Sequence, residues 1–146
     1  MTNQDKNFSE NEVKHLEMIQ SVIMRMGQNS FIVKGLSITL VAGIYTMLDK
    51  STCFSFTYIT IVPILFLWFL DAYYLKKERQ YRELYNMARL HKVNLFDMDI
   101  SHIEGKSSGF WHCFFSKTEW FFYLILIVAT ILVQRQIVLY RMTIIE

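Results

Sequence analysis

Hydrophobic residues are concentrated in three long runs along this chain of 146 residues. The run from Ser51 to Leu70 holds 20 residues without a charge, and the run from Gly27 to Leu48 holds 22 with Lys34 as the single charge. A third run of 15 uncharged residues extends from Trp120 to Gln134. Because about 20 helical residues cross a bilayer core of about 30 Å, the pattern predicts three transmembrane helices.

A helical period also marks two segments outside these runs. Ser9 and Glu12 have the spacing of a capping box, and apolar residues then recur at three- and four-residue steps as far as Met26. This pattern predicts an amphipathic helix over residues 9–27. The second hydrophobic run is followed by helix-forming residues without Gly or Pro, so a helix is expected to leave the membrane there and to continue over residues 72–91.

The remaining segments are shorter and less regular. We expect a short strand within residues 93–100, and Ser116 and Glu119 match a second capping box that opens the third span. The predicted order is a mobile tail at 1–8, an amphipathic helix at 9–27, a first span at 28–48, a second span at 52–71 continued by a helix at 72–91, a loop and interfacial segment at 92–116, a third span at 117–138 and a tail at 139–146.

The composition agrees with a membrane protein. Hydrophobic residues make up 53% of the chain and charged residues 19%, against about 25% charged residues in an average soluble domain. A net charge of +2 gives no argument for nucleic acid, and two cysteines give neither a disulfide framework nor a metal-binding spacing. The expected fold is an all-α membrane protein with three spans and a helical cytosolic part, without a cofactor or a metal.

The basic residues are distributed unevenly about the three spans. Twelve of the 15 lie before the first span, at its start or between the second and third spans. Lys/Arg excess marks the cytoplasmic side of a membrane protein. The predicted location is a bacterial inner membrane, with the N-terminus and residues 72–118 in the cytoplasm and the C-terminus in the periplasm.

Lys34 and Asp71 are the most informative charged residues. One lies at the start of the first span and the other at the end of the second, so an antiparallel hairpin of these spans lets them meet. Ionisable groups in a membrane usually pair or face water. Two interpretations are open: an ion pair that gates the mouth of a pore, or two side chains that reach separately to the lipid headgroups.

Two further groups of residues are candidates for contacts with lipid or with other helices. Arg25, Gln28 and Asn29 form a polar cluster at the entrance of the first span, suited to binding headgroups or the helix at 72–91. Inside the span, Gly35, Thr39 and Gly43 are spaced four apart. Small residues at that spacing allow helices to approach closely in a membrane, although such residues also occur there by chance.

Signals for catalysis are weak. A phosphate-binding loop around Lys106 lacks its first glycine, because Ile100 stands in that place. Neither a nucleophile motif nor a zinc-ligand spacing is found, so the chain is not expected to be an enzyme. An anionic nucleotide could contact the basic residues of the cytosolic part, which are Arg79, Arg82 and Lys106.

Two stretches of the chain resemble a family of uncharacterised small bacterial membrane proteins with several spans. They are HLEMIQSVIMRMGQNSF at 15–31, followed by Lys34 and Gly35, and FLDAYYLKKER at 69–79. The general plan of a few spans with a small cytosolic part is similar to membrane effectors of bacterial antiphage defence, which damage or depolarise the inner membrane. The resemblance implies an architecture and a strategy, and it assigns no role to individual residues.

The leading hypothesis is an effector that forms a homo-oligomer and perturbs or permeabilises the inner membrane in antiphage defence. Its expected partners are the lipid bilayer, further copies of the chain and a soluble cytosolic defence protein. An alternative hypothesis is a membrane-anchored adaptor, or a sensor, that binds a soluble cytosolic partner or a nucleotide signal.

Overall fold

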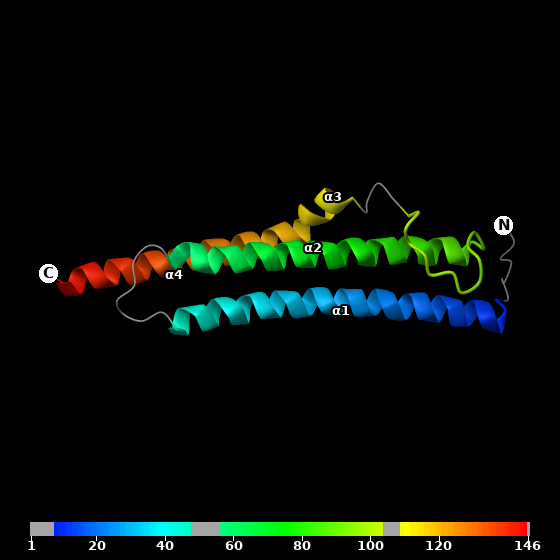
Figure 1. Ribbon diagram of the computed structural model, residues 1–146, viewed down its shortest axis with the longest axis horizontal. Helices are drawn as coiled ribbons and strands as arrows, with labels where there is room; N and C mark the ends of the chain where they lie inside the picture. The colour runs from blue at the N-terminus through cyan, green and yellow to red at the C-terminus, as the bar shows by residue number, and fades with distance from the viewer. Residues whose placement is uncertain (1–7, 48–55, 104–108, 146) are drawn as a thin grey trace, which may run out of the picture.

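The computed structural model describes residues 8–47, 56–103 and 109–145 (Figure 1). Four helices make up this part of the chain: α1 (Glu10–Met47), α2 (Phe56–Arg89), α3 (Phe110–Phe114) and α4 (Lys117–Ile145). The first, second and fourth are long and apolar enough to cross a membrane. The prediction of an all-α chain with three such helices is therefore confirmed, and it points to a membrane location.

Helices α1 and α2 form one long antiparallel pair, and α4 runs beside α2 from near the middle of that pair (Figure 1). The pair therefore has two parts. We call the end that extends beyond α4 the stalk, which consists of residues 10–27, 76–89 and 90–103. We call the part in which α1, α2 and α4 lie together the bundle.

Helix α1 is continuous, although the sequence analysis treats residues 9–27 and 28–48 as separate segments. Gly27 lies within the helix, and a Cβ atom built on it would lie 3.7 Å from Oε2 of Glu78. A glycine inside a helix costs about 1 kcal/mol relative to alanine, which does not end a helix of this length. The 3.7 Å separation is an ordinary contact distance, so an alanine would also fit against α2. The first capping box is present: the Ser9 N–H donates to the Glu12 carboxylate at 2.7 Å, and the Glu12 N–H donates to the Ser9 hydroxyl at 3.3 Å.

The C-terminal segment also continues a helix beyond its predicted boundary. Residues 139–145 belong to α4, where the sequence analysis expects a tail after residue 138. The reason lies in the sequence, because no glycine or proline follows the third hydrophobic run to end the helix.

Two hydrophobic clusters stabilise the two parts of the fold. In the stalk, Ile19 from α1, Leu84 from α2 and Ile103 are buried against one another. In the bundle, Val41, Ile64, Trp68 and Tyr123 form the second cluster, which joins α1, α2 and α4.

The segment after α2 folds back onto the stalk through turns. The expected strand at 93–100 is absent from this described segment, which contains no ladder partner for it. Instead, His91 and Phe96 have positive φ angles of 55° and 63°, and these reverse the chain direction. Contacts with both helices then hold the segment: Nε2 of His15 lies 3.1 Å from the Asp97 carbonyl oxygen, and Nε2 of Gln80 donates to the Ile103 carbonyl at 3.1 Å.

Helix α3 covers the place where α2 and α4 meet (Figure 1). The ring of Phe114 stacks on Trp68 with centroids 4.4 Å apart, and Trp68 also stacks on Tyr123 at 5.6 Å. The indole N–H of Trp68 donates to the Phe114 carbonyl oxygen at 3.3 Å. These contacts fix the start of α4 against α2 and so position the residues described next.

Candidate functional site

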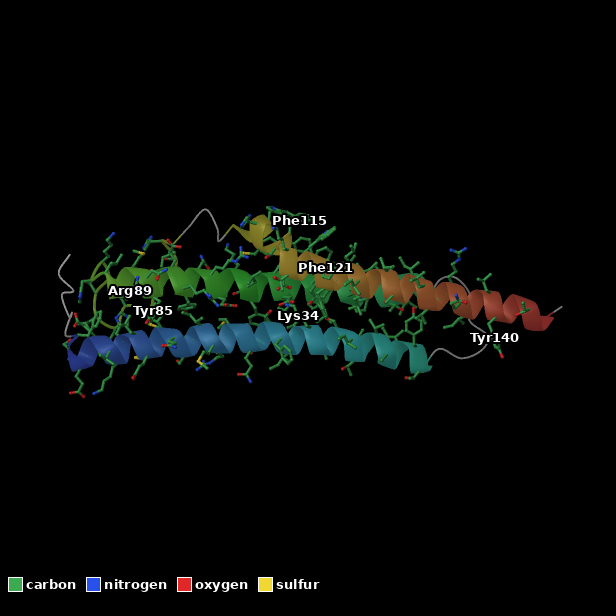
Figure 2. The ribbon with its side chains drawn as sticks, turned by 180° about the vertical axis from the view of Figure 1, so that it is seen from behind. Lys34, Tyr85, Arg89, Phe115, Phe121 and Tyr140 are labelled. Atoms are coloured by element: carbon green, nitrogen blue, oxygen red, sulfur yellow. The ribbon has the colours of Figure 1, made fainter. Side chains whose placement is uncertain are left out.

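The structure brings Lys34 of α1 and Asp71 of α2 together. Nζ of Lys34 lies 2.6 Å from Oδ2 of Asp71. Asp71 is fully buried, and the Lys34 side chain is 18% exposed. Figure 2 shows Lys34 between α1 and the other two long helices, so its ammonium group faces the interior of the bundle and does not reach outward.

A third charged residue, Glu119 of α4, completes this contact. Its two carboxylate oxygens accept from Nζ of Lys34 at 2.8 and 3.0 Å, and the residue is 2% exposed. The second capping box is therefore a wrong prediction, because Glu119 binds Lys34 in place of the Ser116 N–H. That N–H donates instead to the Cys113 carbonyl oxygen at 3.0 Å, and the Ser116 hydroxyl accepts from Arg79 at 3.0 Å.

Two hydroxyl groups extend the network. The Ser30 hydroxyl donates to Oδ1 of Asp71 and accepts from Nζ of Lys34 at 3.0 Å. The Tyr123 hydroxyl donates to Oδ2 of Asp71 at 3.1 Å. We call these five residues the polar cluster: Ser30, Lys34, Asp71, Glu119 and Tyr123. It lies between the hydrophobic clusters of the stalk and the bundle, and each of the three long helices contributes to it.

The charges in the polar cluster do not balance. Two carboxylates share the single ammonium group of Lys34, so the cluster carries one excess negative charge when all three groups are ionised. A buried charge is costly unless it is paired and hydrogen-bonded. The arrangement is thus suited to accept one further positive charge, either as a proton on a carboxylate or as a bound cation.

The sequence could not reveal the whole cluster. The positions of Lys34 and Asp71 follow from a hairpin of two spans, but Ser30, Glu119 and Tyr123 join them only through the packing of α4. One signal for Glu119 was present, because a carboxylate at the start of a hydrophobic run needs a partner or water.

The other candidate residues lie around the polar cluster or away from it. Arg25 and Gln28 are exposed on α1, and Asn29 is half-buried. Gly35, Thr39 and Gly43 lie on an exposed face of α1, where Cβ atoms at the two glycines would meet nothing within 4 Å. This small-residue face therefore packs against neither α2 nor α4.

Of the three basic residues considered for a nucleotide, the structure describes Arg79 and Arg82, and each has a partner within the chain. Arg79 donates to Ser116, and Arg82 pairs with the adjacent Glu78 at 2.6 Å. Lys106 lies outside the described residues.

A cleft of about 400 Å³ does open in the stalk. Its polar lining includes Glu83, Lys92, Asp97, Asp99 and His102. Hydrogen bonds from the backbone N–H and the hydroxyl of Ser101 hold the pKa of Asp99 below its usual value.

Within the described residues, no group of three His, Cys, Asp or Glu side chains is arranged to bind a metal ion.

Neither a model of a known protein family, nor a curated protein, nor a solved structure matches the chain. The functional argument therefore rests on the polar cluster and its surroundings.

Proposed function

We propose that this chain is an inner-membrane effector that assembles as a homo-oligomer and permeabilises the bilayer when its cytoplasmic stalk is engaged. The observation that supports this most is the polar cluster. Charged groups within membrane helices are expensive, and by default they indicate function. Here they lie where all three long helices meet.

The cluster is placed to control the position of α4. The Lys34–Glu119 ion pair joins α4 to α1 at one end of the bundle, and the Tyr45 hydroxyl donates to the Thr130 carbonyl oxygen at 2.8 Å further along. A buried ion pair is weak evidence for stability, because desolvation offsets most of its Coulomb energy. We infer that the pair serves as a releasable link between these two helices.

The proposed orientation rests on the distribution of charge along the sequence. Twelve of the 15 basic residues precede the first span, start it or lie between the second and third spans, which supports a cytoplasmic stalk and a periplasmic C-terminus. Antiphage defence as the biological setting is proposed from similarity of architecture alone.

Replacing Glu119 with alanine should open the bilayer without a trigger. The change leaves Lys34 paired with Asp71, so the charges balance while the link from α1 to α4 is lost. We expect dye leakage from vesicles containing the purified variant to rise at least fivefold over vesicles containing the unchanged protein. Glu17→Ala, at an exposed position of α1, is the control and should leave leakage unchanged. Glu119→Ala vesicles as tight as the control would contradict a releasable link.

The small-residue face of α1 supports assembly with a second copy. Because a side chain at Gly43 would meet nothing within the chain, Gly43→Ile should preserve the fold and block close approach of another helix. We expect light scattering in nanodiscs to show a smaller complex for this variant. Val128→Ile, at an exposed position of α4, should keep the original mass. An unchanged mass for both variants would exclude this face as the interface.

The stalk cleft favours a second candidate function, a membrane-anchored adaptor or sensor. The cleft lies at the far end from the bundle and has a mixed polar and charged lining. Under this alternative, Glu119→Ala vesicles stay tight, and Met87→Trp, which fills the cleft, abolishes capture of a soluble partner by the full chain.

A further inference from the structure

Two cavities meet along the seam between α1 and α4. The first, which we call the polar cavity because charged side chains reach into it, has a volume of about 340 Å³. Its lining combines apolar surface, including Phe31 and Leu75, with the polar residues Lys34, Glu78, Arg79, Ser116, Thr118 and Glu119. The second, of about 630 Å³, is an apolar groove lined by Ile38, Phe121, Phe122, Ile125, Leu126 and Ala129, with Lys117 and Thr118 at its head. Thr118 lines both cavities, so the two adjoin at this residue.

We propose that this seam binds one phospholipid molecule whose headgroup carries both a phosphate and a primary ammonium group, as phosphatidylethanolamine does. The inference rests on the proposed membrane-spanning arrangement, and it is independent of permeabilisation.

The apolar groove suits an acyl chain. It runs along the membrane-spanning parts of α1 and α4, and Ile38 and Phe121 on its two sides are 52% and 61% exposed. Figure 2 shows Phe121 on the early part of α4, close to the level of Lys34. A helix from a second copy could cover the groove, but an apolar helix would leave the charges of the adjoining polar cavity unsatisfied.

The cationic side of the polar cavity suits the phosphate. Arg79 donates to the Ser116 hydroxyl, Thr118 lines the same cavity, and Lys117 lines the adjoining groove. Arginine recognises phosphate through paired N–H donors. The N-terminal end of α4 also lies here and adds backbone N–H groups that favour an anion.

The acidic side suits the ammonium group. When Glu119 and Asp71 are both ionised they share Lys34, so this side lacks one positive charge, and Glu119 lines the cavity. A primary ammonium supplies that charge and can donate hydrogen bonds to the carboxylate. A phosphate-only headgroup would bring a second anion beside Glu119 and Glu78, and a trimethylated ammonium has no N–H to donate.

The test uses the purified full chain, freed of lipid and mixed with equal amounts of phosphatidylethanolamine, phosphatidylglycerol and phosphatidylcholine with matched acyl chains. Native mass spectrometry counts the bound lipids. We expect at least a fivefold preference for phosphatidylethanolamine. Ile38→Trp fills the groove and should reduce bound lipid at least fivefold, while Leu36→Trp, at an exposed position of α1 outside the groove, should not.

The headgroup contact is tested by Glu119→Gln. This change removes the excess negative charge and retains a polar side chain. The ratio of bound phosphatidylethanolamine to bound phosphatidylglycerol should therefore fall towards one. Equal binding of the three lipids by the unchanged protein would show non-selective surface lipid and overturn the proposal. So would an Ile38→Trp variant that retains all its phosphatidylethanolamine. Neither readout depends on dye leakage. A failed lipid-binding test therefore leaves the proposed function standing, and a failed leakage test leaves the lipid site standing.

Discussion

Replacing Lys34 with methionine is expected to lower the free energy of unfolding by about 3–5 kcal/mol. Asp71 and Glu119 are 0% and 2% exposed, and Lys34 is the cation that both of them contact. Without Lys34, the buried carboxylates of α2 and α4 lie close together with no cation between them. Unfolding of the purified chain in mixed micelles, followed by tryptophan fluorescence, measures the loss.

Two further variants separate this effect from a general loss of charge. Lys14 pairs with Glu10 on the surface of α1, with side chains 57% and 83% exposed, so Lys14→Met should cost less than about 1 kcal/mol. Combining Lys34→Met with Asp71→Asn and Glu119→Gln removes all three charges and should restore much of the stability. If Lys34→Met costs no more than Lys14→Met, the polar cluster does not hold the bundle together.

Replacing Leu84 with alanine should destabilise the stalk by about 2–5 kcal/mol. Leu84 is 1% exposed and packs between Ile19 of α1 and Ile103 of the folded-back segment. In the proposed arrangement the stalk lies outside the membrane, where water supplies the hydrophobic driving force that lipid cannot give. Hydrogen exchange should therefore speed up in both helices of the stalk and in residues 93–103 together.

The matched control is Leu90→Ala. Leu90 follows α2 directly and is 50% exposed, so its truncation should change stability by no more than about 0.5 kcal/mol. If hydrogen exchange in residues 93–103 is equally fast in Leu84→Ala and Leu90→Ala, the folded-back segment is not packed on the helices in solution.

Hydrophobic run length was sufficient to predict the three long helices, because the bilayer sets a length that few other segments satisfy. Local patterns were less reliable where a tertiary contact competed with them. The amphipathic pattern and the first hydrophobic run suggested two segments that divide at residue 27, but α1 continues through Gly27 without interruption. The alternating residues at 93–100 looked like a strand, but the described chain offers no strand partner and the segment packs on helices instead.

Only the part of the candidate site that depends on chain topology, the contact between Lys34 and Asp71, could be predicted from the sequence. A hairpin of the first two spans brings Lys34 near Asp71, whatever the details of packing. The position of α4 depends on Phe114 and Tyr123, which both stack on Trp68, and no sequence period encodes those contacts. Glu119 consequently looked like a helix cap, although its actual partner lies 85 positions earlier in the chain.

The continuity of α1 has a mechanical consequence. At 1.5 Å per residue, its 38 residues span about 57 Å, and Lys34 divides this length into arms of about 36 Å and about 20 Å. If the polar cluster serves as the pivot, α1 acts as a lever with unequal arms. A sideways movement of about 10 Å at Glu10 then becomes a movement of about 5 Å at Met47, with the force nearly doubled. Under the proposed function, a weak binding event on the stalk would then become a shorter and more forceful displacement at the other end of α1.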